Sequence, residues 1–120
     1  MTDIDLGQLK DEDFCYLTTT GRVSGRQHTI EIWFALEGKT LYMLAGGREK
    51  SDWVKNVLKN PAVQVRIAKS TFKGQARVVE SGEEDTLARR LVLDKYTPRD
   101  SDDLTEWSRT SLPVAVDLDV

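Results

Sequence analysis

Apolar and polar residues alternate with a period of two in several short segments of the chain. The clearest of these runs from His28 to Leu36, where Ile30, Ile32 and Phe34 share a face with Leu36. Such alternation is typical of a β-strand with one face in a core. With turn-rich stretches as boundaries, the pattern predicts six strands, at residues 14–20, 28–36, 40–45, 63–67, 72–80 and 114–120.

One segment between the strands has helical spacing instead. It begins at Ser51, a residue type that caps helices, and runs to about Lys59, where Asn60 and Pro61 end it. Its apolar stripe consists of Trp53, Val54, Val57 and Leu58. We expect this stripe to face the core.

A second helix is predicted before residue 97. Ser81 and Glu84 have the spacing of a capping box, and Thr97 with Pro98 closes the segment. Its apolar stripe consists of Leu87, Ala88, Leu91, Val92 and Tyr96. Residues 104–107 suggest a helical turn, and residues 1–13 suggest an N-terminal arm or a short helix.

Short turns join the predicted strands, which antiparallel pairing permits and parallel pairing does not. Six short strands are enough for a small closed or half-closed barrel with helices packed against it. The sequence therefore predicts a mainly β (α+β) fold, a six-stranded antiparallel β-barrel with two to three packed helices. A chain of 120 residues suits one core, so we expect a single domain over residues 1–120.

The net charge of −3 conceals an uneven distribution of charge. Residues 21–77 carry a net charge of +7, between −4 on residues 1–20 and −6 on residues 78–120. A positive middle favours an anionic ligand there, although scattered solvated Lys and Arg side chains would give the same count. The acidic ends argue against general binding to nucleic acid, which uses a broad basic face.

Several classes of protein are disfavoured by the composition. No apolar run approaches the roughly 20 residues that a membrane-spanning helix needs, and the acidic N-terminal stretch lacks the features of a signal peptide. Cys15 is the only cysteine and His28 the only histidine, which excludes an intrachain disulfide and disfavours a four-ligand zinc site. We therefore expect a cytoplasmic protein without a metal centre.

The loop between the first two strands is the first candidate for chemistry. Gly21 and Gly25 permit tight backbone geometry, and Ser24 with exposed amide groups can bind phosphate oxygens. Arg22 and Arg26 each offer a forked set of donors to a phosphate or a carboxylate. The alternative is a polar hairpin loop with two solvated arginines.

The second candidate loop leads from the third strand directly into the first helix. Gly46 and Gly47 break the strand, and the N–H groups near Ser51 favour an anion at the start of the helix. Arg48 and Lys50 add positive charge at the same place. The alternative is an ordinary Gly-Gly turn with a serine cap. Both loops follow a strand and pair glycine with arginine, so we expect them to meet at one edge of the barrel.

Two further side chains have open interpretations. His28 is the only histidine, the residue type that most readily changes charge near neutral pH, but a lone histidine at a strand start is more often structural or exposed. Trp33 lies opposite the apolar face of its strand, where it could stack on a planar ring, cover a dimer interface or pack on the second helix. No set of nucleophile, base and acid stands out, so the sequence identifies no catalytic residue.

Several of these segments together resemble a known family. They are TTTGRVSGR, then a hairpin, then LYMLAGG, then a helix reading WVKNVLKNPAVQV, and they follow one another from about Leu17 to Glu80. They resemble the deazaflavin-dependent nitroreductase and quinone reductase family, which belongs to the flavin-reductase-like split β-barrels. The resemblance implies a six-stranded split barrel, often a homodimer, that holds coenzyme F-420 (F420) or a related flavin.

The resemblance also implies where the cofactor binds. In the family, the tail phosphate and carboxylates lie near the two loops described above. Together with the neighbouring histidine, the cofactor-binding residues implied for this chain are Arg22, Ser24, Gly25, Arg26, His28, Gly46, Gly47, Arg48, Lys50 and Ser51. The hydride chemistry would then belong to the cofactor, and the protein would supply position and electrostatics.

The function that follows is an oxidoreductase that uses reduced deazaflavin to transfer hydride to a quinone-like or nitroaromatic acceptor. Two alternatives remain open: the same barrel binding FMN, and a carrier that binds a cofactor or small ligand without turnover. We also expect a homodimer, because Trp33 and the apolar strand faces can bury surface against a second copy. No nucleic-acid partner is expected.

Overall fold

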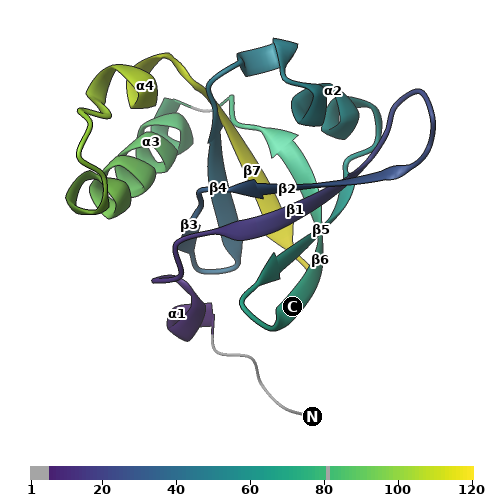
Figure 1. The fold of residues 1–120 in the computed structure, drawn as a ribbon, viewed down its shortest axis with the longest axis horizontal. Coiled ribbons are helices and arrows are strands. Elements are labelled where there is room, and N and C mark those ends of the chain that lie inside the picture. The colour runs from purple at the N-terminus through teal and green to yellow at the C-terminus, as the bar shows by residue number, and fades with distance from the viewer. Residues whose placement is uncertain (1–5, 81) are drawn as a thin grey trace.

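The computed structural model describes residues 6–80 and 82–120, and Figure 1 shows a curled sheet with helices packed around it. The strands are β1 (Cys15–Thr20), β2 (Gln27–Ile32), β3 (Ala35–Glu37), β4 (Thr40–Ala45), β5 (Ala62–Ile67), β6 (Ser70–Val78) and β7 (Leu112–Leu118). The helices are α1 (Leu6–Leu9), α2 (Asp52–Lys59), α3 (Gly82–Tyr96) and α4 (Thr105–Thr110), with two 3-10 turns, η1 (Arg48–Lys50) and η2 (Thr97–Arg99).

The sheet curls because of its strand order. Every pair is antiparallel, in the order β2-β1-β5-β6-β7-β4-β3. β2 and β3 lie at opposite ends of this order, yet only Trp33 and Phe34 separate them in the sequence. The sheet must therefore curl until its two ends approach, as Figure 1 shows. The predicted mainly β barrel with packed helices is confirmed.

The prediction of one strand over residues 28–36 was wrong. The segment divides into β2 and β3 at Trp33 and Phe34, which raises the strand count from six to seven. At this break, the backbone N–H of Phe34 donates to Tyr96 Oη at 3.0 Å, and Lys95 Nζ donates to the carbonyl of Phe34 at 2.9 Å. Side chains of α3 thus replace the neighbouring strand as partners, while the Phe34 ring stays buried in the core.

Other boundaries differ by a few residues. β6 and β7 each begin and end two residues before the predicted strands, so Val120 lies beyond β7 and is 51% exposed. The helical turn predicted at 104–107 is the helix α4. Ser81, predicted as part of a capping box, lies outside the described residues, as do residues 1–5 of the predicted arm.

The core lies inside the curled sheet and under α2. Inward-facing residues of the strands fill it, among them Leu17, Leu41, Val65 and Val116. The predicted stripe of α2 needs one correction, since Val54 and Val57 are buried but Leu58 is 58% exposed. Asn56, a polar residue on the other side of the stripe, is buried instead and only 5% exposed. This buried amide belongs to the candidate site.

Helices α3 and α4 cover the side of the sheet formed by β3, β4 and β7. Trp33 stacks on Tyr96 with ring centroids 4.2 Å apart and meets Trp107 edge-on at 5.6 Å. Of the three interpretations of Trp33, packing on the second helix is therefore the one that the structure shows.

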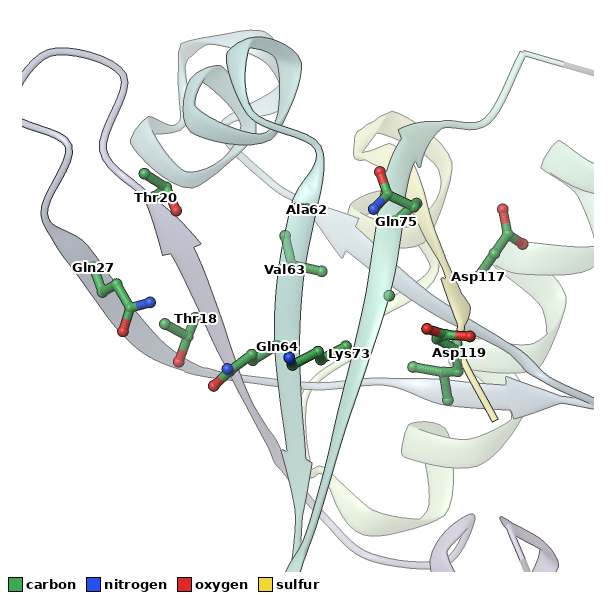
Figure 2. A pocket seen from close by; sticks show the side chains of 12 residues that line it. Thr18, Thr20, Gln27, Ala62, Val63, Gln64, Lys73, Gln75, Asp117 and Asp119 are labelled. Carbon is green, nitrogen blue, oxygen red and sulfur yellow. The ribbon is translucent and has the colours of Figure 1, made fainter.

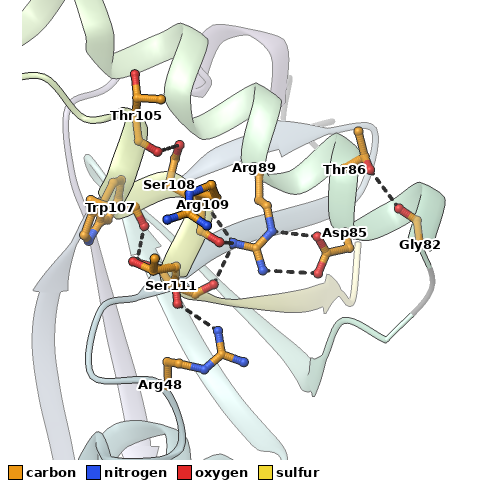
Figure 3. A network of polar contacts seen from close by, with 11 residues as sticks. Arg48, Gly82, Asp85, Thr86, Arg89, Thr105, Trp107, Ser108, Arg109 and Ser111 are labelled. Carbon is orange, nitrogen blue, oxygen red and sulfur yellow. Dashed lines mark hydrogen bonds and ion pairs between the residues drawn. The ribbon is translucent and has the colours of Figure 1, made fainter.

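Arg89 fastens α4 to α3, as Figure 3 shows. Its Nη1 donates to the carbonyl oxygens of Ser108 at 2.7 Å and Ser111 at 2.7 Å, and to that of Arg109 at 2.9 Å. Its Nε pairs with Asp85 at 2.6 Å. The guanidinium thus satisfies carbonyls that the end of a helix leaves without partners.

Candidate functional site

The loop between β1 and β2 lies beside the N-terminal part of α2, and an open groove of about 660 Å³ separates them. Figure 1 shows the loop and the helix at the same end of the barrel. The groove is lined by Thr19, Gly21, Arg22, Val23, Ser24, Gln27, His28, Thr29, Ile30, Asp52, Trp53 and Asn56. Three of the residues predicted to bind cofactor, Arg22, Ser24 and His28, therefore share one groove.

Arg22 joins the loop to the helix. Its backbone N–H and its Nη1 both donate to Asn56 Oδ1, at 3.1 and 2.9 Å. Its Nη2 lies 3.3 Å from Asp52 Oδ1. Asn56 in turn donates from Nδ2 to the buried hydroxyl of Thr19 at 3.3 Å. The loop is therefore anchored at Arg22, whose side chain remains 33% exposed at the groove.

The rest of the loop is a tight turn. Gly25 has a φ of +73°, a conformation that favours glycine, and its N–H donates to the carbonyl of Gly21 at 3.0 Å. Ser24 Oγ accepts from the backbone N–H of Arg26 at 3.1 Å, which leaves its O–H free to donate. The Arg26 side chain is exposed, and Val23 at the tip is 92% exposed.

Gly21 and His28 face one another across the base of the loop. A Cβ on Gly21 would lie 2.9 Å from His28 Nε2, closer than real Cβ atoms come to other heavy atoms. The absence of a side chain at Gly21 thus lets the imidazole lie against the backbone. His28 belongs to β2, which lies at the end of the strand order and pairs only with β1.

The second predicted loop is placed differently. Arg48 has a φ of +51°, and its Nη1 donates to the carbonyl of Thr110 at the end of α4 at 2.8 Å (Figure 3). Its Nε pairs with Glu49 at 3.3 Å. Its guanidinium is therefore bound to α4, and it does not line the groove. Gly46 packs under Trp107, whose Nε1 would lie 3.3 Å from an added Cβ.

The start of α2 also differs from the prediction. Ser51 occupies the N-cap position with extended backbone, but its hydroxyl makes no capping hydrogen bond. A Cβ on Gly47 would meet Ser51 Oγ at 2.6 Å, so that hydroxyl lies against Gly47 instead. Lys50 is exposed in η1. The two loops approach the same helix, but only the first contributes side chains to the groove.

Asp52, Trp53 and Asn56 line the groove without having been predicted as site residues. Trp53 had been assigned to the core, and it is partly buried there while also reaching the groove. The signal for Asn56 was present in the sequence, because it is a polar residue next to the apolar stripe of Val54 and Val57. An amphipathic pattern, however, does not say which partner such a residue meets.

A second open groove of about 660 Å³ lies on the outer face of the sheet, as Figure 2 shows. Outward-facing polar side chains line much of it, including Thr18, Thr20, Gln64 and Gln75. Gln27 lines both grooves, so they meet at β2. The sequence analysis did not predict this groove, because alternating polar positions are expected on any solvated sheet face.

Two side chains that could react chemically, those of Cys15 and Lys95, are buried or hydrogen-bonded in the structure. Burial raises the pKa of the Cys15 thiol to about 12, so the thiol stays protonated and is a poor nucleophile at neutral pH. Burial lowers the pKa of Lys95 to about 8, and its Nζ is held by the carbonyl of Phe34. Neither lines the groove.

The fold and the groove together define a class, a small split β-barrel with cationic and hydroxyl donors beside one helix. A family model described as F420H2-dependent quinone reductase matches residues 4–119. The chain therefore belongs to this family. It is an F420-dependent oxidoreductase, and coenzyme F420 is its cofactor.

Solved structures share the fold of this chain. A structure of an F420-H2 dependent reductase is 25% identical, covers 87% of this chain and 93% of its own, and has a TM-score of 0.70. One described as a domain-swapped dimer is 27% identical, covers 87% of this chain and 79% of its own, and has a TM-score of 0.71. An F420 reductase covers all of this chain and 97% of its own at a TM-score of 0.71, but at 16% identity it shows the fold alone.

The described residues lack two further features. Within residues 6–80 and 82–120, no helix has the length and apolar character needed to cross a bilayer. The same residues contain no cluster of three or more potential metal ligands.

Proposed function

We propose that the chain transfers hydride from reduced F420 to a quinone-like or nitroaromatic acceptor, with the cofactor's anionic tail in the groove between the β1–β2 loop and α2. The observation that carries this proposal is the groove itself, in which Arg22, Ser24 and His28 meet the first turns of α2. Donors of this kind bind phosphate and carboxylate oxygens, and the N-terminus of a helix adds a favourable dipole.

The residues present fit such a cofactor chemically. Its tail carries phosphate and carboxylate groups, which suit the guanidinium of Arg22 and the free O–H of Ser24. Arg26 is exposed on the same loop and can close over an anion from outside. The flat side of a deazaflavin ring suits an aromatic and aliphatic surface, which Trp53 and Ile30 provide in the same groove.

When bound, F420 in its reduced form supplies the hydride. The chain's own part is to hold the anionic tail, orient the ring and exclude water from one side of it. This division of labour agrees with the sequence, which identifies no nucleophile with a paired base. It also agrees with the buried thiol of Cys15, which is not placed to react.

The second loop has a different part in this proposal. Gly46, Gly47 and Ser51 provide backbone and shape at the start of α2, and Arg48 holds that loop against α4. Lys50 contributes positive charge nearby and is not among the residues that line the groove. We therefore assign direct contact with the anionic tail to Arg22, Ser24, Arg26 and His28. Gly25 shapes the loop through its positive φ, and the second loop has a supporting part.

The acceptor class rests on two kinds of support. The description of the family names a quinone, and the sequence resembles nitroreductase members of the same group. An acceptor assay separates a reductase from a carrier: oxidation of reduced F420 is followed with a soluble quinone and with a nitroaromatic compound. Tight binding of F420 without oxidation by either acceptor would favour the carrier alternative.

The binding site is tested by fluorescence titration of the purified protein with F420 and with FMN. We expect micromolar or tighter binding of F420, and a loss of about 10- to 150-fold in Arg26→Ala, because a charge-assisted contact contributes roughly 1.5–3 kcal/mol. Arg90→Ala is the matched control, since Arg90 is an exposed arginine on α3 away from the groove. Equal weakening in both variants would contradict the loop assignment, and preferential binding of FMN would contradict the cofactor.

We further propose a homodimer in the cytoplasm. The support is β2, a strand at the end of the sheet order whose first residues are exposed on both faces. Such a strand can be covered by a second copy of the chain. A structure described as a domain-swapped dimer, at 27% identity, adds support from a relative.

A further inference from the structure

Arg22 contacts two residues of α2, and its hydrogen bonds to one are shorter than those to the other. Asn56 Oδ1 accepts from its backbone N–H at 3.1 Å and from its Nη1 at 2.9 Å. Asp52 makes the longer contacts, with Oδ1 3.3 Å from Nη2 and its carbonyl oxygen 3.4 Å from Nη1. The guanidinium thus lies at the groove with its charge already balanced by a carboxylate of the same chain.

The two partners also differ in burial. Asn56 is 5% exposed, whereas the Asp52 side chain is 86% exposed. An exposed ion pair contributes little to stability, because water and salt compete with it. A buried amide that loses its hydrogen bonds is costly. Of the two contacts, the one to Asp52 therefore costs less to break than the bonds to Asn56.

We propose that Asp52 is an internal competitor for the anionic group of the ligand. The inference rests on the proposed function, because it takes this groove as the site of the cofactor's tail. Without ligand, the carboxylate neutralises Arg22. With ligand, a phosphate or carboxylate oxygen takes over the Nη2 of Arg22, and Asp52 turns into solvent. Asn56 keeps the arginine aimed at the groove in both states.

This exchange makes the groove selective. A neutral ligand gains nothing from Arg22 unless it can replace a carboxylate, which a hydroxyl or carbonyl group does poorly. A phosphate can do so, because it offers the guanidinium two parallel charge-assisted bonds. Asp52 therefore lowers the affinity for all anions while it excludes neutral ligands, and its removal should strengthen the binding of anions.

The test is calorimetric titration of F420 into the wild-type protein, Asp52→Asn and Glu49→Gln. We expect Asp52→Asn to bind about three- to tenfold more tightly, since a competing charge within contact distance of Arg22 is gone. Glu49→Gln is the matched control, because it removes an exposed carboxylate of the preceding turn that pairs with Arg48 instead. Its affinity should stay within about twofold of wild type.

A double variant distinguishes competition through Arg22 from plain repulsion. In Arg22→Ala, which binds more weakly, adding Asp52→Asn should restore little, because no guanidinium remains for which to compete. An undiminished gain in that background would overturn the inference, as would equal affinity of wild type and Asp52→Asn. The absence of F420 binding in every protein would overturn the proposed function together with the inference, so the two failures can be told apart.

Discussion

At the residue scale, Asn56 connects the candidate site to the core. Its Oδ1 accepts two bonds from Arg22, and its Nδ2 donates to Thr19 Oγ1 inside the barrel. Thr19 is 2% exposed, so its hydroxyl has no access to water as a substitute partner. One buried amide therefore holds the β1–β2 loop, the first strand and α2 in a common geometry.

We predict that Asn56→Ala lowers the free energy of unfolding by about 2–3 kcal/mol, because it leaves the buried Thr19 hydroxyl and the Arg22 N–H without their partner. Urea unfolding followed by circular dichroism measures this change. Lys55→Ala, an exposed neighbour on the same helix, is the control and should change stability by no more than about 0.5 kcal/mol. Similar losses in the two variants would contradict the role given to Asn56.

At the element scale, an ion-pair network fastens α3 to the sheet. Arg77 of β6 binds Glu84 of α3 through Nη1 at 2.6 Å and Nη2 at 2.8 Å, and its Nε binds Asp117 of β7 at 2.7 Å. Tyr42 of β4 donates to Glu84 at 2.8 Å. The hydrogen bonds from Arg77 lead the causes that lower the pKa of Glu84 to about 2.

This network predicts how the free energy of unfolding depends on pH. A carboxyl whose pKa is lowered on folding contributes stability that is present above its unfolded pKa, near 4.5, and lost as the pH falls through about 2. We expect wild type to lose about 2 kcal/mol more than Glu84→Gln between pH 5 and pH 2. Urea unfolding at several pH values measures this difference.

Glu83→Gln serves as the control for that experiment, since Glu83 is exposed on the same turn of α3. Its stability should follow the wild-type pH dependence. A wild-type curve parallel to that of Glu84→Gln across this range would show that Glu84 does not fasten α3 to the sheet.

At the scale of the whole molecule, β2 is the end strand of the sheet that a second copy of the chain could contact. It pairs with β1 on one side, and its residues border both grooves through Gln27. Thr29 on the same strand is exposed apart from a contact between its Oγ1 and that of Thr18 at 2.7 Å. The proposed dimer would cover this strand and bring a second copy next to the site.

Sedimentation velocity at about 10 µM tests the dimer. We expect a species of about twice the 13.6 kDa chain mass, and Thr29→Lys should shift it toward monomer, because a charge on an edge strand opposes pairing. Thr86→Lys on the exposed surface of α3 is the control and should leave the dimer intact. A wild-type sample that sediments as a single species near 13.6 kDa would rule out the dimer at this concentration.

Much of the local structure could be predicted from the sequence. The strand at residues 40–45 is β4 with the same bounds, and the helix that Asn60 and Pro61 were expected to end is α2, which ends at Lys59. These signals are local: alternation requires only that one face be buried, and a proline ends a helix through its own backbone. For the same reason, the family motif could be recognised from residues in order along the chain.

The tertiary structure decided the rest. The strand over residues 28–36 breaks because Tyr96, 62 residues away, bonds the backbone of Phe34, and no period in the sequence records that contact. Arg48 and Arg22 look equivalent in their Gly-Arg loops, yet one is bound to Thr110 and the other to Asn56. A side chain's partner depends on which distant segment the curled sheet brings to it. Residue type limits the bonds that it can make, and packing selects which of them form.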